Sequence, residues 1–232
     1  EETARLDYED GVTMVIVDIP IVVPEGASFM YDTVPLGIIL TENNIVTVCT
    51  EETPLIEDFW EKRVKQFDTC KRTRLVLQLL YRNASRYLRY LRQIDKASTQ
   101  VEDALHKSMK NRELIQMLKL EKSLVYFSTS LKSNEVVLEK LLRGNMIKRY
   151  PDDTDLLEDV IIENKQAIEM CTIYRDILSG TMDAFASVIS NNLNIVMKLL
   201  ASITIVLAIP SIFFSLWGMN TAVPWEGTMA GF

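Results

Sequence analysis

The stretch "LLASITIVLAIPSIFFSLW", residues 199–217, decides the fold because it contains 19 residues and no charged side chain. As an α-helix it would be about 28 Å long, against a hydrocarbon core of about 30 Å in a bilayer. We therefore predict a transmembrane helix. A buried core helix is the alternative, but the rest of the chain is too small and too helical to enclose it.

The charges beside this span predict its orientation. Lys198 directly precedes the span, Arg175 and Lys165 lie further upstream, and residues 199–232 contain no Lys or Arg. Loops on the cytoplasmic side of a membrane carry an excess of Lys and Arg. We therefore expect the large N-terminal part of the chain to lie in the cytoplasm.

The span continues a much longer helical pattern. After Pro151 the next proline is Pro210, and Gly180 is the one residue in between that weakens a helix. Residues 152–217 are therefore predicted to form a single helix of roughly 100 Å. A helix of this length is a coiled coil, a stalk between compartments, or both.

The N-terminal part is predicted to contain strands followed by helices. Residues 12–23, 36–40 and 45–49 are rich in β-branched side chains and indicate strands, the last two joined as a hairpin. Thr53 as N-cap and Pro54 at the first helical position predict the start of a helix. The patterns at 71–109 and 112–143 predict two long antiparallel helices.

Composition and charge exclude several classes of protein. The formal net charge of -7 argues against nucleic acid as a partner, since phosphate binding needs a clustered positive surface. Cys49, Cys70 and Cys171 lie far apart, so neither a disulfide framework nor a structural zinc site is indicated. Nothing near the single histidine, His106, supplies a nucleophile or an orienting partner, so we place no catalysis there.

Small or weakly polar side chains recur along the span at seven-residue steps. Positions 197, 204, 211 and 218 are Met, Thr, Ser and Gly, and positions 201, 208 and 215 are Ala, Ala and Ser. On a helix these positions lie along one side, which we call the small-residue stripe. This pattern leaves two interpretations open: close packing of helices in lipid, or a water-lined pore made by identical helices from several subunits.

The residues after the span resemble a known family. "GMN" at Gly218, Met219 and Asn220 directly follows the predicted transmembrane helix and is similar to the signature of the CorA family of divalent-cation channels. Three further segments resemble the stalk and pore helix of that family in order and spacing: "ENKQAIEM" at 163–170, "DILSGTMDAFASVIS" at 176–190 and "NNLNIVMKLL" at 191–200. The resemblance covers most of the chain, from the strands through Phe232.

The resemblance implies a fold and an assembly. The expected fold class is an α+β membrane protein that forms a homopentamer, in which each subunit adds a second transmembrane helix outside the first. The sequence stops at "WEGTMAGF", where that second span should begin, and the early part of the α/β domain is absent. We therefore expect the chain to belong to a longer, multi-pass polypeptide of the cell membrane.

Five segments are expected along the chain. They are a partial cytoplasmic α/β domain at 1–70, an antiparallel helical hairpin at 71–150, a stalk helix at 151–198, the first transmembrane helix at 199–217, and the GMN motif with an extracytoplasmic loop at 218–232.

The resemblance also assigns roles to residues of the ion path. Asn220 is expected to form a ring of carboxamide oxygens at the outer mouth, with Gly218 allowing close approach of the backbone and Met219 packing the turn. A helix C-cap is the alternative role of Asn220, and both roles can hold together. The remaining residues of the expected pore and gate are Asn194, Met197, Leu200, Thr204, Ala208, Ser211 and Ser215.

Acidic residues are expected to regulate the ion path. Six carboxylates and no base lie between Pro151 and Glu163, and most of them suit a solvated helix start. Asp159 matches the stalk aspartate of the family that faces the α/β domain of a neighbouring subunit. "YEDG" at 8–11 resembles the partner segment, with Asp10 and Glu9 as ligands, and Asp183 is a further candidate on the stalk.

These expectations combine into one function. The chain is predicted to be a subunit of a channel for Mg²⁺, driven by the membrane potential and gated by Mg²⁺ bound between subunits, with lipid as its surroundings. Neither enzymatic activity nor an organic cofactor is expected. The alternatives are a transporter of Zn²⁺, Co²⁺ or Ni²⁺ from the same family and a membrane-anchored coiled-coil scaffold that conducts no ions.

Overall fold

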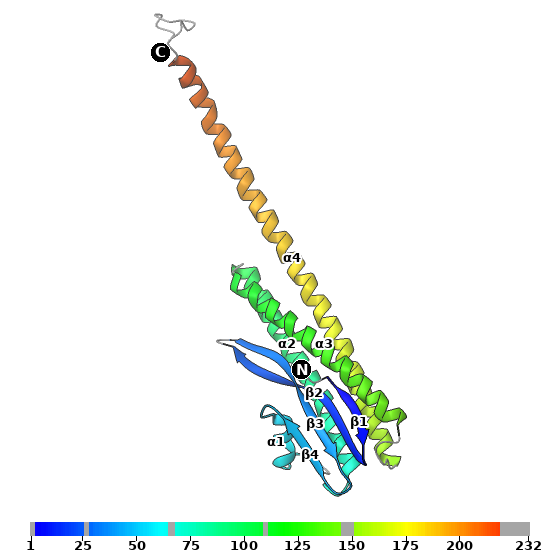
Figure 1. Ribbon diagram of the computed structural model, residues 1–232. Helices are drawn as coiled ribbons and strands as arrows, with labels where there is room; N and C mark the ends of the chain where they lie inside the picture. Colours follow the sequence, from blue (N-terminus) through cyan, green and yellow to red (C-terminus); the bar gives the residue numbers. More distant parts are fainter. Residues whose placement is uncertain (1–2, 26–27, 65–67, 109–110, 145–150, 219–232) are drawn as a thin grey trace, which may run out of the picture. The chain divides into compact units, whose positions relative to one another are not determined.

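The computed structural model describes residues 3–25, 28–64, 68–108, 111–144 and 151–218. The chain divides into two compact units, Glu1–Met182 and Asp183–Phe232. The first unit contains a sheet, three helices and the first part of a fourth helix, and the second contains the rest of that fourth helix (Figure 1).

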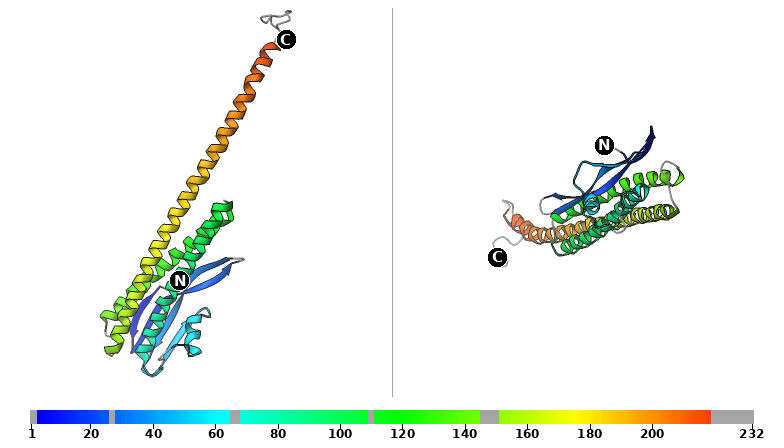
Figure 2. Two further views of the ribbon diagram at one scale, coloured as in Figure 1. Left: turned by 180° about the vertical axis from the view of Figure 1, so that it is seen from behind. Right: turned by 90° about the horizontal axis from the view of Figure 1, so that it is seen from below.

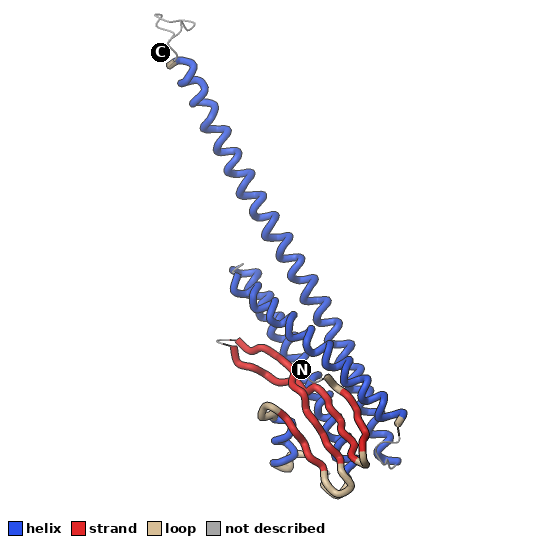
Figure 3. The backbone as a smooth tube through the Cα atoms, in the orientation of Figure 1, coloured by secondary structure: helices blue, strands red, loops and turns tan. Residues whose placement is uncertain are grey.

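Four antiparallel strands form the sheet, and they follow one another in space as they do in sequence (Figure 3). They are β1 (Arg5–Glu9), β2 (Val12–Glu25), β3 (Ser28–Leu40) and β4 (Ile45–Cys49). The three predicted strands are confirmed, including the hairpin in which Leu40 pairs with Ile45. The strand signal did not reveal β1 or the first half of β3. That half of β3 pairs with the second half of β2, from Ile19 to Glu25.

The turn between β1 and β2 explains how β1 forms. Glu9 pairs with Val12, so the loop consists of Asp10 and Gly11 alone. The φ angles of these two residues are 49° and 79°, which are left-handed values at both central positions, as in a type I′ turn. An Asp-Gly pair is a strong hairpin signal in a sequence, and it was available here at residues 10 and 11.

The helices begin and end close to the predicted positions. They are α1 (Pro54–Trp60), α2 (Arg72–Ser108), α3 (Asn111–Arg143) and α4 (Pro151–Trp217). The Oγ1 atom of Thr53 accepts a hydrogen bond of 3.2 Å from the Leu55 N–H, which confirms the predicted N-cap. The predicted single helix from the stalk into the span is confirmed as α4, which contains 67 residues.

One hydrophobic core joins the sheet to the helices of the first unit. Buried residues of β2 and β3 belong to the same cluster as Leu77 of α2, Val137 of α3 and Leu157 of α4. α2 and α3 lie side by side against one face of the sheet (Figure 2). The carbonyl of Leu131 accepts a hydrogen bond from the Asn164 side chain, which fixes α4 against α3. Residues 1–70 and 71–150 thus share their core with the first part of the expected stalk.

A polar contact inside this unit ties α3 to β2. Asp18 lies beyond Ile16, the last residue of β2 that pairs with β1, so none of the described strands bonds to its backbone on that side. The Asn134 side chain takes the place of a strand: its Oδ1 accepts from the Asp18 N–H and its Nδ2 donates to the Asp18 carbonyl, both at 2.8 Å. The same carbonyl accepts from Asn83 Nδ2 and the Tyr87 hydroxyl of α2.

We predict that Asn134→Leu destabilises the first unit by about 1–3 kcal/mol, because the Asp18 N–H loses its acceptor in a part-buried site. Urea unfolding of the full chain in detergent, followed by near-ultraviolet circular dichroism, measures the loss. Thr129→Ala is the control, since its hydroxyl is exposed on the same helix and bonds only to the Val125 carbonyl of that helix. Equal stability of the two variants would contradict the prediction.

Candidate functional site

The residues expected to line an ion path lie on the part of α4 that belongs to the second unit. Every one of them from Asn194 to Ser215 is exposed in the single chain, as are the large apolar side chains around them. Within the described part of the chain, α4 is the one helix long and apolar enough to cross a membrane. The described residues of the chain therefore leave the apolar surface of this segment uncovered.

Three hydroxyl groups of this segment donate hydrogen bonds to carbonyls of their own helix. Thr204 Oγ1 donates to the Leu200 carbonyl at 2.9 Å, Ser211 Oγ to the Leu207 carbonyl at 3.0 Å, and Ser202 Oγ to the Lys198 carbonyl at 2.8 Å. Because its hydrogen is committed to the backbone, each hydroxyl offers only lone pairs to its surroundings. These side chains are therefore acceptors for any water that approaches the helix.

The helix ends at the expected signature. The Gly218 N–H donates to the Phe214 carbonyl at 3.0 Å and closes the last turn. A Cβ atom at Gly218 would lie 3.3 Å from that same carbonyl oxygen, which is a tight contact. Met219 and Asn220, the other two residues of the motif, lie outside the described residues.

An exposed apolar face on the first part of α4 was missed by the sequence reasoning. Ile162, Ile173 and Ile177 are exposed by 62%, 54% and 56% of their surface. Their spacings of eleven and four residues place them on one side of the helix, and these spacings could have been recognised in the sequence. The first unit thus carries an apolar surface that none of its described residues covers.

The expected regulatory carboxylates occupy separate elements. Glu9 and Asp10 lie at the end of the β1–β2 hairpin, while Asp159 and Asp183 lie on α4, and all four are exposed. The described residues offer none of these four side chains a hydrogen bond or an ion pair. Across the same residues, no three His, Cys, Asp or Glu side chains gather as they would around a metal ion. One subunit by itself therefore contributes separate ligands and no complete metal site.

Together, the fold and the exposed segment define a class of protein: an α/β domain joined through one continuous helix to a segment suited to a membrane. A comparison with protein families identifies the family. The model described as "CorA-like Mg2+ transporter protein" matches residues 1–232, so the chain belongs to this family.

Known relatives agree with this assignment. The cobalt/magnesium transport protein CorA of Methanocaldococcus jannaschii is 26% identical over 229 residues, which are 95% of this chain and 69% of that protein. The complete structure of that magnesium transporter matches with a TM-score of 0.86 and covers 100% of this chain and 73% of the other. The predicted family resemblance is therefore confirmed.

More distant structures share the fold alone. The full-length CmaX protein matches with a TM-score of 0.79 at 18% identity, over 97% of this chain and 69% of that chain. The cytoplasmic domain of ZntB from Vibrio parahaemolyticus matches with a TM-score of 0.62 at 13% identity, over 84% of this chain and 75% of that chain.

A buried thiol lies where α3 and α4 meet. Cys171 is fully buried and its Sγ donates to the Leu124 carbonyl at 3.1 Å. Burial raises the pKa of this thiol to about 11, although the nearby positive charges of Arg175 and Lys132 oppose the shift. The thiol is therefore neutral over the physiological range, and Cys171 packs as an apolar residue.

We predict that a maleimide at neutral pH labels the exposed Cys70 of the folded chain and leaves Cys171 unlabelled, as mass spectrometry of the peptides would show. The pKa of Cys171 is higher in the folded chain than that of a free thiol, so the neutral thiol favours the folded state. This contribution to stability is complete below about pH 9 and is lost as the pH rises towards 11. Cys171→Ala should remove this part of the alkaline loss. Rapid labelling of Cys171 at neutral pH would contradict the assignment.

Proposed function

We propose that the chain is a subunit of a homopentameric channel that admits hydrated Mg²⁺ through a pore lined by α4. The observation that carries the proposal is the small-residue stripe, which runs exposed along the apolar segment of α4 and ends at the GMN motif of a CorA-family chain. Five copies of α4 around one axis would turn the stripe towards a shared interior. The exposed isoleucines of the first unit would then pack between copies.

Coordination chemistry explains why such a lining suits Mg²⁺. This ion holds its water tightly, so a pore that removed the water would face a large barrier. Water bound to a cation directs its hydrogens outwards, and the surrounding groups must therefore accept hydrogen bonds. Thr204 and Ser211 meet this need because their own hydrogens are committed to backbone carbonyls. The side chains of Ala208 and Ser215 are small and would leave room for a hydrated ion in the pore.

The two ends of this pathway have different roles. Asn220 of five subunits would form a ring of carboxamide oxygens that select the hydrated ion, with Gly218 and Met219 shaping the turn that holds it. At the inner end, Asn194, Met197 and Leu200 would form the constriction, where rings of large apolar side chains stop ions by excluding water. The membrane potential drives the flow, at about 4.6 kcal/mol per 100 mV for a divalent ion.

Regulation would come from carboxylates that meet across a subunit boundary. Asp159 of one subunit would face Asp10 and Glu9 of the next, and these unpaired negative charges repel one another until a divalent ion bridges them. Cytoplasmic Mg²⁺ would therefore stabilise a closed, symmetric pentamer, and its loss would shift the population towards open states. Asp183 is a lesser candidate on the same helix.

Another divalent cation is the alternative substrate of the same class. The name of the Methanocaldococcus jannaschii relative includes cobalt as well as magnesium. We therefore propose Mg²⁺ as the principal ion and Co²⁺ as a competing one. Adding Co²⁺, Ni²⁺ or Zn²⁺ to the flux assay below ranks these ions, and a scaffold without conductance would show no flux of any of them.

We predict that Asn220→Ala lowers the Mg²⁺ flux of the complete protein in liposomes by about tenfold or more. A tenfold fall corresponds to about 1.4 kcal/mol, which is the free energy of about one hydrogen bond between the Asn220 ring and the hydrated ion. A Mg²⁺-sensitive dye inside the liposomes measures the flux under an imposed potential. Asn43→Ala, which removes an exposed amide from the β3–β4 turn, is the control. Flux that is absent in the parent protein, or equal in both variants, would refute the channel proposal.

Removal of the proposed regulatory carboxylates should weaken the inhibition of flux by Mg²⁺ on the cytoplasmic side. Asp159→Ala combined with Asp10→Asn should raise the inhibitory concentration of Mg²⁺ by about tenfold, the effect of losing about 1.4 kcal/mol of ion binding. Asparagine is chosen at position 10 because it tolerates the left-handed backbone of the turn and alanine does not. The control is Asp155→Ala, an exposed carboxylate one turn earlier on α4. Unchanged inhibition in the double variant would place regulation elsewhere.

A further inference from the structure

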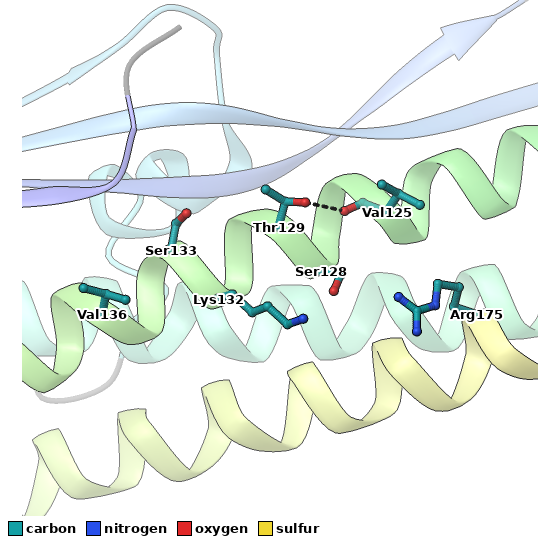
Figure 4. A pocket seen from close by; sticks show the side chains of 7 residues that line it. All are labelled: Val125, Ser128, Thr129, Lys132, Ser133, Val136 and Arg175. Carbon is teal, nitrogen blue, oxygen red and sulfur yellow. Dashed lines mark hydrogen bonds between the residues drawn. The ribbon is translucent and has the colours of Figure 1, made fainter.

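A groove between α3 and α4 in the first unit has no role in the proposed ion path. Its volume is about 510 Å³, and it is lined by six residues of α3 together with Arg175 of α4 (Figure 4). In the close view, Lys132 extends along the groove towards the Arg175 guanidinium, and the Ser128 hydroxyl lies between the two helices. Three hydrogen-bond donors of two helices therefore converge on one space.

The groove concentrates positive charge in a chain of net charge -7. No carboxylate belongs to its lining. The Lys132 ammonium has no ion pair with any described residue. Arg175 has one acidic contact, the exposed Asp176 beside it on α4, at 3.2 Å from Nη2 and 3.4 Å from Nε. The Nη1 donors of Arg175 remain for a ligand.

Ser128 adds a donor that the protein leaves unused. The Ser128 residue is only 7% exposed, and its hydroxyl makes no hydrogen bond with a described residue. A serine inside a helix usually donates to the carbonyl four residues earlier, as Thr129 does to Val125. For Ser128 that carbonyl belongs to Leu124, which accepts the helical N–H and also the Cys171 thiol. That carbonyl already accepts from the thiol, and the Ser128 side chain lines the groove.

We propose that this groove binds a phosphate group. A phosphate offers several acceptor oxygens and negative charge, which match the ammonium of Lys132, the guanidinium of Arg175 and the hydroxyl of Ser128. Ser128 and Lys132 are four residues apart, so they lie on the same side of α3. The volume exceeds that of a single phosphate and accommodates a phosphate that is part of a larger anion.

Binding here would link two elements that meet through few polar contacts. Lys132 and Ser128 belong to α3 and Arg175 to α4, so one anion would bridge the helical hairpin and the helix that continues into the apolar segment. A ligand that binds only the folded chain also stabilises it. Phosphate should therefore raise the melting temperature of the first unit.

Isothermal titration of the full chain in detergent, in a chloride buffer, tests the proposal with inorganic phosphate and with pyrophosphate. We expect saturable binding of one anion per chain and a higher melting temperature. Lys132→Gln and Arg175→Gln should each weaken binding by about tenfold, and Ser128→Ala should weaken it by a smaller factor. A third titration, with dihexanoyl phosphatidic acid, distinguishes the source: tighter binding than pyrophosphate indicates a lipid head group, and weaker binding indicates a free phosphate compound.

The matched control is Lys140→Gln, which removes an exposed positive charge from the same helix outside the groove. Because Lys132 is also exposed, both lysine variants are expected to fold, as circular dichroism would verify. Absence of saturable binding for all three probes, or an equal loss in Lys132→Gln and Lys140→Gln, would overturn the proposal. Neither binding nor melting depends on ion flux, so this result is independent of the channel proposal.

Discussion

The pair of hydrogen bonds between Asn134 and the backbone of Asp18 is the contact on which the first unit depends. A strand that extends beyond its neighbour leaves N–H and carbonyl groups that cannot be buried without partners. Here an amide side chain of α3 imitates the peptide group of a missing strand, and α2 adds two more donors to the same carbonyl. The sheet edge, both long helices and, through α3, the start of α4 are thereby held in one arrangement.

α4 exposes apolar side chains that the described residues of the chain leave uncovered. Leu157, Val160 and Cys171 are buried inside the first unit, while Ile162 and Ile173 are exposed on the opposite side of the helix. A helix with two apolar sides usually has two partners. The first partner is the chain's own hairpin, and a second copy of the chain is the natural candidate for the other. The homopentamer proposed above would supply that copy.

Much of the fold could be predicted from the sequence because strong local signals agree with the final structure. The uncharged segment, the absence of proline between 151 and 210, and the Thr53-Pro54 pair each fix an element by local physics. The first half of β3 could not be predicted this way, since Asp32 and Pro35 weaken its strand signal and its pairing with β2 is a tertiary effect. The groove at Ser128 was also beyond sequence reasoning, because it forms where α3 meets Arg175 of α4, and that meeting is a tertiary effect. The motif residues were found by family resemblance, and what they do in the assembly stays a proposal.

The turn at Asp10 shows how one position can satisfy two unrelated demands. The hairpin requires a residue that accepts a left-handed backbone, which favours glycine, asparagine or aspartate. The proposed interface with a divalent ion requires a negative charge, which favours aspartate or glutamate. Aspartate alone belongs to both groups. During divergence, a change to asparagine would therefore abolish the charge while the hairpin survived, and a change to glutamate would keep the charge at the expense of the hairpin. Loss of ion sensing and loss of folding would appear in a lineage as separate events.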